Sequence, residues 1–136
     1  MKVLVDTPIW SLAFRKKKEN KTNETIINNL TQLIKNRQIA IIGSIRQEIL
    51  SGISDKNKYF EIKNKMSAFP DYVIKTEDYE FAAECSNQCR INGIQGSHTD
   101  FLICAIAIKN DWEIFTEDTD FNNYVKYIPI KLYKPK

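Results

Sequence analysis

The sequence is poor in the residues that most enzymes use as nucleophiles, metal ligands or phosphate-binding loops. It has 136 residues, and His98 is its single histidine. A nucleophilic serine or cysteine needs a neighbouring base, and the sequence places no obvious triad around His98. A zinc site needs about four cysteine or histidine ligands, and the four glycines form no phosphate-binding loop. These absences disfavour triad hydrolases, zinc enzymes and P-loop proteins.

The cysteines and the hydrophobic runs bear on where the protein works. An odd number of cysteines argues against a disulfide framework, so we predict that Cys85, Cys89 and Cys104 are buried, reduced thiols. No stretch approaches the roughly 20 apolar residues of a membrane span. Asp6 interrupts the first apolar run too early for a signal peptide. Together these features predict a cytoplasmic protein with no membrane partner.

Positive charge is in slight excess and unevenly distributed. The formal net charge of +3 argues only weakly for a polyanionic partner. Arg15, Lys16, Lys17 and Lys18, with Lys21, form one basic cluster, and a second cluster lies among the last six residues. Either cluster alone is explained as solvated charge in a loop or tail.

Short apolar runs alternate with helical patterns, which predicts one α/β domain over residues 1–136 with a parallel, doubly wound sheet. Strands are expected at 1–6, 39–42, 72–74 and 114–115, with a short edge strand at 130–133. The first two are continuous apolar runs, which is typical of strands buried on both faces. We therefore expect four or five strands flanked by helices, with the first strand in the centre.

The helices are placed by apolar residues at helical spacing. They are expected at 9–14, 23–36, 44–52, 54–69, 76–92 and 100–109. Asn23 and Thr76 are candidate N-caps, and the stretch from Ser44 to Gln47 has the form of a capping box. Gly52 is expected to end the third of these helices.

Acidic residues are predicted at the carboxyl edge of the sheet, where open α/β proteins bind ligands. Asp6 directly follows the first strand, and Asp118 and Asp120 follow the strand at 114–115. Asp100 opens a helix that is otherwise uncharged up to its last residue. Glu48 lies beside the buried stripe of its own helix.

Each of these acids also has an ordinary structural explanation. Asp6 suits a turn or a helix cap, Asp100 complements a helix dipole, and the loop around Asp118 can be solvated. Glu48 can reach water at the rim or pair with Arg46. Their shared location favours function, because packed carboxylates repel one another and take up protons unless a cation neutralises them. Oxygen ligands suit Mg²⁺ or Mn²⁺.

Four stretches, in this order along nearly the whole chain, carry a family resemblance. They are Val3-Leu4-Val5-Asp6-Thr7, Glu48-Ile49-Leu50-Ser51-Gly52, Asp100-Phe101-Leu102-Ile103-Cys104-Ala105 and Ile114-Phe115-Thr116-Glu117-Asp118-Thr119-Asp120-Phe121. The chain resembles the PIN-domain family, and within it the toxin ribonucleases of the VapC type. The resemblance implies a Mg²⁺- or Mn²⁺-dependent endoribonuclease that hydrolyses RNA phosphodiester bonds. It also implies a homodimer and an antitoxin protein as inhibitor.

The resemblance assigns roles to individual residues as well. The quartet that would bind metal and catalyse is Asp6, Glu48, Asp100 and Asp118. Thr7 and Thr116 are similar to the hydroxyl residues that support such a quartet, and Asp120 to an auxiliary acid. The basic cluster from Arg15 to Lys18 is not part of the general family pattern, and we predict that it contacts RNA phosphates.

The implied hydrolysis leaves alternatives open. Bound metal ions can lower the pKa of a water molecule, or a carboxylate, Asp6 or Asp118, can take the proton from that water. An aspartate-nucleophile phosphatase of the haloacid dehalogenase type is disfavoured, because such chains carry a second aspartate where this one has Pro8. A non-catalytic RNA-binding PIN-like module and a PIN nuclease of RNA processing remain as alternatives.

Overall fold

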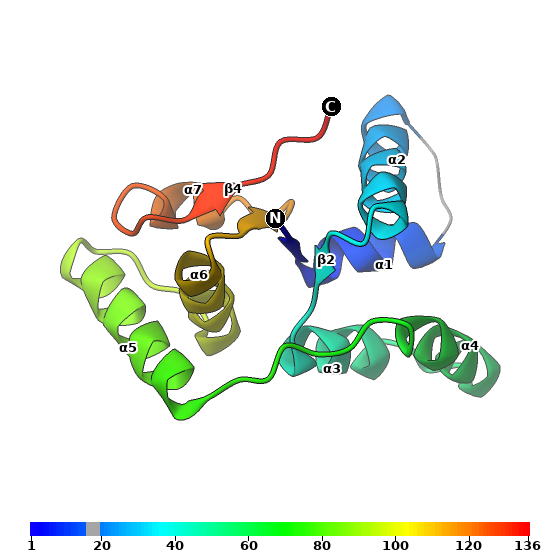
Figure 1. The fold of residues 1–136 in the computed structure, drawn as a ribbon, viewed down its shortest axis with the longest axis horizontal. Helices are drawn as coiled ribbons and strands as arrows, with labels where there is room; N and C mark the ends of the chain where they lie inside the picture. The colour runs from blue at the N-terminus through cyan, green and yellow to red at the C-terminus, as the bar shows by residue number, and fades with distance from the viewer. Residues whose placement is uncertain (16–19) are drawn as a thin grey trace.

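The computed structural model describes residues 1–15 and 20–136 (Figure 1). The described chain forms the following elements in order: β1 (Val3–Val5), α1 (Thr7–Arg15), α2 (Lys21–Lys35), β2 (Ile39–Ala40), α3 (Gly43–Ser51), α4 (Lys56–Met66), α5 (Thr76–Ile91), α6 (His98–Asn110), β3 (Glu113–Phe115), α7 (Phe121–Tyr124) and β4 (Lys131–Leu132). In the described ranges, no helix is both long and apolar enough to cross a membrane.

The four strands form one parallel sheet in the order β2-β1-β3-β4, so the first strand lies in the centre, as the sequence predicts. Leu4 is in register with Ala40 on one side and with Ile114 on the other. The pairing continues one residue past β1, because the Asp6 N–H donates to the Phe115 carbonyl at 2.9 Å. The fold class is therefore α/β with a parallel sheet flanked by helices.

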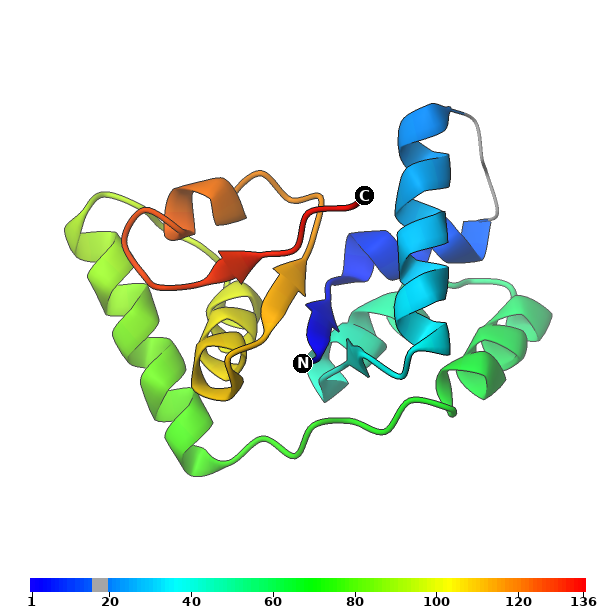
Figure 2. The same ribbon diagram turned by 45° about the horizontal axis from the view of Figure 1, so that its top comes forward.

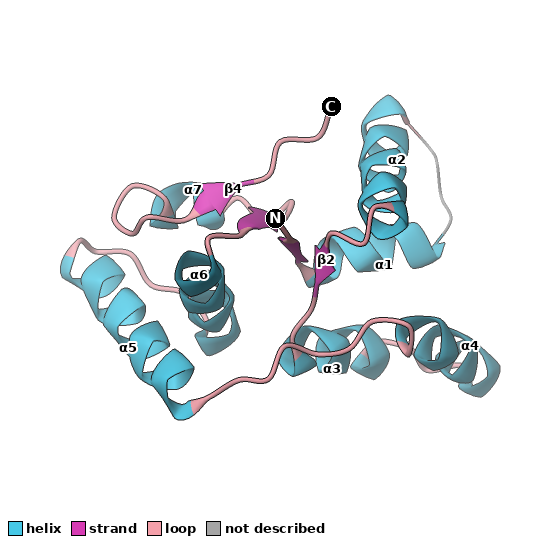
Figure 3. Cartoon of the chain, viewed as in Figure 1, coloured by secondary structure: helices cyan, strands magenta, loops and turns pink. Residues whose placement is uncertain are grey.

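The helices cover the sheet from both sides. In Figure 1, α5 and α6 lie on one side of the central strands and α1 and α2 on the other, with α3 and α4 below. Figure 2 shows α5 running beside α6 and the long connection from α4 passing under the sheet to α5. Figure 3 makes clear how short the strands are compared with the helices around them. The strands therefore need the helices to bury them.

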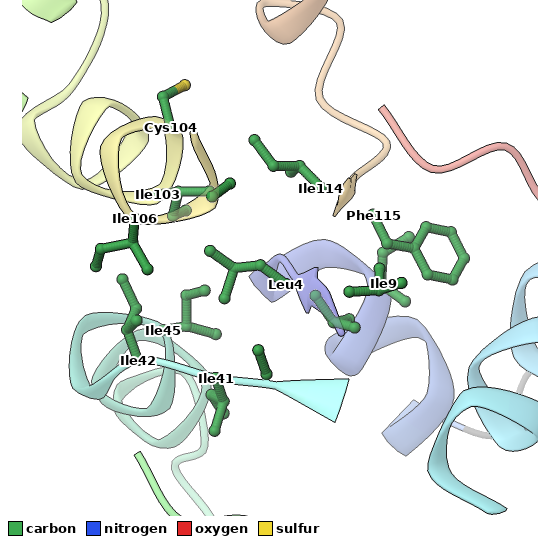
Figure 4. Close-up of a cluster of buried hydrophobic side chains, with 14 of the residues drawn as sticks. Leu4, Ile9, Ile41, Ile42, Ile45, Ile103, Cys104, Ile106, Ile114 and Phe115 are labelled. Carbon is green, nitrogen blue, oxygen red and sulfur yellow. The ribbon is translucent and has the colours of Figure 1, made fainter. Parts of the chain in front are cut away.

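Apolar side chains from the strands and from the helices around them meet in one core, part of which is drawn in Figure 4. Leu4 of β1 has no exposed surface and faces Ile103 and Ile106 of α6. Helix α6 is buried at every position from Phe101 to Ala107, which explains why that stretch carries no charge. Each phenylalanine, leucine or isoleucine of this stretch contributes about 1.5 to 3 kcal/mol on burial.

Two predicted strands differ from the structure. The segment 72–74 is not a strand: it makes a single backbone hydrogen bond to the sheet region, from the Tyr72 N–H to the Ile41 carbonyl at 2.8 Å. Val73 is 75% exposed, so this apolar triplet covers the rim of the core and does not enter the sheet. The second strand ends at Ala40, because Ile42 already serves as the N-cap of α3.

Three predicted N-caps are also wrong. Asn20, not Asn23, caps α2, and its side chain accepts a hydrogen bond from the Asn23 N–H at 2.8 Å. The predicted capping box at the start of α3 is absent, because the helix begins at Gly43 and Ile42 offers no side-chain oxygen. Thr76 is the first residue of α5, and Lys75 is the cap.

Candidate active site

Asp6 lies at the carboxyl end of the central strand and both of its carboxylate oxygens accept hydrogen bonds. Oδ1 accepts from the Thr7 N–H, and Oδ2 accepts from the Thr116 hydroxyl, each at 2.8 Å. The side chain is only 6% exposed. Two neighbouring strands thus hold one carboxylate in a fixed orientation at the sheet edge, since Thr116 directly follows β3.

Glu48 reaches the same edge from α3. Its carboxylate accepts a hydrogen bond from the Thr7 hydroxyl at 2.8 Å, so Thr7 contacts Asp6 through its N–H and Glu48 through its side chain. The alternative that Glu48 pairs with Arg46 does not hold. Arg46 forms an ion pair with Asp71 at 3.0 Å and donates to backbone carbonyls after α4.

Asp100 lies in the first turn of α6. Its N–H donates to the Ser97 hydroxyl at 3.0 Å, which caps the helix, so the carboxylate is not used for capping. Oδ2 of Asp100 instead accepts a hydrogen bond from the Tyr124 hydroxyl at 2.7 Å. Tyr124 is fully buried. Gly96 makes room for it, because a Cβ at that position would overlap the Tyr124 hydroxyl.

The loop after β3 is organised around its own acids. The Asp118 N–H donates to the Thr116 hydroxyl oxygen at 3.0 Å, and the Asp120 N–H donates to Asp118 Oδ1 at 2.9 Å. Thr116 therefore uses its proton on Asp6 and its lone pair on the Asp118 backbone. These turns, typical of aspartate and threonine, direct the loop acids back toward the sheet edge.

The four acids of the predicted quartet converge on one pocket of about 370 Å³. Asp6, Glu48, Asp100 and Asp118 all line it, although they come from four segments of the chain. Among the described residues, carboxylate oxygens of Asp100, Asp118 and Asp120 also lie within 4.8 Å of one another. The structure thus brings the predicted acids together, while their roles in metal binding and catalysis stay predictions.

The electrostatics of the pocket favour a positive ligand. Burial raises the pKa of Asp6 to about 6; the charges of Asp100 and Glu48 also raise it, and the hydrogen bonds from Thr116 and Thr7 oppose the shift. Burial likewise raises the pKa of Asp100, with a contribution from the charges of the two loop aspartates. A bound cation removes this conflict, since it favours the ionised carboxylates. The donor set, oxygen atoms alone, fits a hard divalent ion such as Mg²⁺ or Mn²⁺.

The predicted basic cluster is only partly described. Arg15 lines the acidic pocket from the end of α1, and its Nε–H donates to the Ser11 carbonyl at 3.3 Å. Lys16, Lys17 and Lys18 lie outside the described residues. The sequence pattern gives no sign that Tyr124 and Gly96 belong to the site, because their contacts with it depend on the path of the loop before α6.

The prediction of buried, reduced cysteines is confirmed. Cys85 and Cys89 of α5 and Cys104 of α6 are free and buried. Burial raises the pKa of each of these thiols above its usual range. They are therefore neutral core residues near the helix contact, and poor nucleophiles.

Comparisons with known proteins agree on the fold. The chain is similar to FitAcB from Neisseria gonorrhoeae, with a TM-score of 0.78, 17% identity, and 98% of this chain and 97% of that chain covered. It is similar to VapBC2 from Rickettsia felis bound to a DNA fragment from their promoter (TM-score 0.76, 20% identity, 98% of each chain). A toxin-antitoxin complex from Klebsiella pneumoniae is also similar (TM-score 0.67, 20% identity, 88% of this chain and 90% of that one).

At these identities the structural likeness establishes the fold alone. A comparison with curated proteins found no match to this chain. The family model of the PIN domain, however, matches residues 3–127, a range that contains Asp6, Glu48, Asp100 and Asp118. With nearly the whole sequence matched and the same fold in its structure, the chain belongs to the PIN domain family.

Proposed function

We propose that this chain is a Mg²⁺- or Mn²⁺-dependent endoribonuclease that hydrolyses RNA phosphodiester bonds. The observation that carries the proposal is the convergence of Asp6, Glu48, Asp100 and Asp118 on one pocket at the carboxyl edge of the sheet. Membership of the PIN domain family supports it. A chain that served only to bind RNA would gain nothing from a pocket that repels phosphate.

The same four acids are the proposed metal ligands, and Asp120 is an auxiliary acid beside Asp100 and Asp118. A divalent metal, when bound, lowers the pKa of a water ligand and stabilises negative charge on the phosphate. The threonines have a separate task. Thr7 orients Glu48, and Thr116 orients Asp6 and the loop that carries Asp118.

The proton of the attacking water needs an acceptor within the pocket. We propose Asp6 or Asp118 as this general base; both line the pocket. Arg15, which also lines the pocket, can contact a phosphate of the RNA on the side of α1. Lys16, Lys17 and Lys18 follow it in the sequence and extend the proposed contact.

We further propose that the chain is the toxin of a type II toxin–antitoxin pair, and that it acts in the cytoplasm as a homodimer inhibited by a cognate antitoxin. A structural neighbour from Klebsiella pneumoniae is a toxin-antitoxin complex, which supports this assignment. The buried thiols suit a reducing compartment.

The test is a metal titration of RNA cleavage with matched variants. The wild-type chain should cut RNA with Mg²⁺ or Mn²⁺ and not in EDTA. Glu48→Gln should lose cutting, while Glu117→Gln, which removes an exposed acid of the loop after β3 that does not line the acidic pocket, should keep it. Cutting that persists in EDTA would contradict the metal requirement. Binding of RNA without any cutting would favour the non-catalytic alternative.

A further inference from the structure

A second hollow begins where the acidic pocket ends. It has a volume of about 500 Å³ and lies between α5 and the first turns of α6. We call it the α5–α6 pocket; its walls include Tyr79, Ala82, Arg90, His98, Phe101 and Leu102. Thr99, the residue before Asp100, lines both this pocket and the acidic pocket. A third hollow shares Ser44 and Thr99 with the α5–α6 pocket, and Glu48 and Thr99 with the acidic pocket. The three hollows therefore adjoin one another, and we call them together the groove.

The charge along this groove changes sign. The acidic pocket is lined by four carboxylates, whereas none of the described residues that line the α5–α6 pocket is acidic. Arg90 provides a positive charge there. Its guanidinium donates to the Asn87 side chain at 2.6 Å and forms no ion pair with any carboxylate in the described ranges. An unpaired guanidinium is suited to an anionic ligand such as a phosphate.

The rest of the pocket has the features of a base-binding site. Tyr79 is 58% exposed and lines the pocket, so its ring is accessible to a ligand. The floor is apolar, because Phe101 and Leu102 are buried beneath it. Ser86 and Asn87 add neutral hydrogen-bonding groups. An aromatic ring, an apolar floor and a few polar groups are what proteins use to hold unpaired bases.

We propose that the α5–α6 pocket binds one nucleotide of a single-stranded RNA substrate, beside the phosphodiester that is cut at the acidic pocket. Arg90 contacts a phosphate of that nucleotide and Tyr79 stacks on its base. The inference rests on the proposed function, because it adds a nucleotide subsite next to the same acidic pocket. A volume of about 500 Å³ lies within the range of small-ligand pockets.

The single-stranded state follows from how the base is held. In an A-form duplex the bases stack on one another, and their faces are closed to a protein ring. Tyr79 can stack only on a base that has left the helix. Loops and unpaired ends are therefore the expected substrates, and fully paired RNA should bind poorly.

The binding test uses the Asp100→Asn chain with Mg²⁺, so that the probe is not cut. The probe is a fluorescein-labelled single-stranded RNA of about ten nucleotides, within the usual site size, compared with the same strand in a duplex. Arg90→Gln should raise Kd about fivefold or more and lower the slope of log K against log salt by about 0.7. Tyr79→Ala should raise Kd about fivefold or more.

Two controls separate stacking and local charge from general effects. Tyr79→Phe keeps the ring and should stay within about twofold of the parent chain. Lys35→Gln removes an exposed positive charge at the end of α2, away from the groove, and should also stay within about twofold. In the chain with Asp100 intact, Arg90→Gln and Tyr79→Ala should raise KM more than they lower kcat.

Several results would contradict the proposal that the α5–α6 pocket binds a nucleotide. Parent-like RNA binding by both Arg90→Gln and Tyr79→Ala would do so, as would equal affinity for duplex and single strand. Variants that lose self-association and keep RNA binding would assign the pocket to a protein interface. The proposed function fails separately: a wild-type chain that cuts no RNA with either metal, while the binding losses appear in the Asp100→Asn background, would overturn catalysis and keep the pocket.

Discussion

Replacing Tyr124 with phenylalanine removes one hydroxyl from behind the acidic pocket and keeps the buried ring. That hydroxyl donates to Asp100 Oδ2 at 2.7 Å, and the ring packs on Phe101 and Phe121. A hydrogen bond to a charged group contributes about 1.5 to 3 kcal/mol. We expect a loss of free energy of unfolding at the lower end, about 1.5 kcal/mol, because the half-buried Asp100 can take up a water molecule.

The larger effect should be on metal binding. Groups that hold a ligating carboxylate in place typically contribute about 10- to 100-fold in metal affinity. We therefore expect the Mn²⁺ concentration that gives half of the thermal stabilisation to rise about tenfold or more in Tyr124→Phe. The measurement is Tm as a function of Mn²⁺ for both chains. An unchanged Mn²⁺ midpoint in a folded Tyr124→Phe chain would refute the role of Tyr124 in positioning Asp100.

Gly96 offers an independent check on the same contact. A Cβ at this position would overlap the Tyr124 hydroxyl and lie 2.8 Å from its Cζ atom. Gly96→Ala should therefore push the hydroxyl away from Asp100 and weaken Mn²⁺ binding. In the Tyr124→Phe background, where the hydroxyl is gone, the same change should weaken it much less. Fully additive effects of the two substitutions would contradict this mechanism.

Three further predictions concern charge. Without metal, the Asp6 pKa of about 6 lies above its unfolded value of 3.8, so the protonated carboxyl stabilises the fold below pH 3.8 and this contribution, at most about 3 kcal/mol, disappears as the pH rises through 6. Urea unfolding in EDTA should show a larger loss of stability with rising pH in the wild-type chain than in Asp6→Asn, which retains only the loss due to Asp100. Saturating Mn²⁺ should raise Tm, because a ligand at 100 times its Kd adds about 2.7 kcal/mol to the free energy of unfolding. The Asp6→Asn, Glu48→Gln double variant should show no rise in Tm. Neutralising Lys16, Lys17 and Lys18 should weaken RNA binding alike for all sequences, and should reduce the slope of log K against log salt by about 2 for single strands. An unchanged slope would mean that these lysines are solvated charges that do not contact RNA.

The central part of the fold was predictable from the sequence for a physical reason. Val3–Val5 is a short, wholly apolar run, which is typical of a strand covered on both faces. Asp6 follows directly, so its place at the carboxyl edge follows from chain connectivity. The uncharged stretch after Asp100 is long enough for a helix and indicates a buried one.

The errors arose where local pattern and tertiary contact disagree. The triplet 72–74 has strand-like side chains, but Tyr72 packs its ring on Trp112 and Val73 faces solvent. The segment therefore crosses the rim, and within the described part of the chain its backbone bonds to the sheet region only through the Ile41 carbonyl. Asn23 has the chemistry of a cap, yet Asn20 has the same chemistry and lies three residues earlier. Sequence pattern alone does not rank two such asparagines.

The candidate site was predictable as a set of acids and not as a geometry. The sequence indicates that the four carboxylates share one edge, because three of them follow strands or begin a helix there. It gives no sign that Thr7 joins Asp6 to Glu48 or that Tyr124 holds Asp100. Those contacts are made between segments far apart in the chain, and they depend on side-chain rotamers within the folded core.

The most direct test of the central claim is single-turnover RNA cleavage by the Asp100→Asn chain with Mg²⁺, beside the wild-type chain and Glu117→Gln at matched thermal stability. Asparagine keeps the size of Asp100, so the expected stability loss is about 1 kcal/mol or less, but it lacks the anionic oxygen that holds a hard cation. We predict a rate drop of at least about a thousandfold for Asp100→Asn and none for Glu117→Gln. A folded Asp100→Asn chain that retains more than about a tenth of the wild-type rate would contradict it.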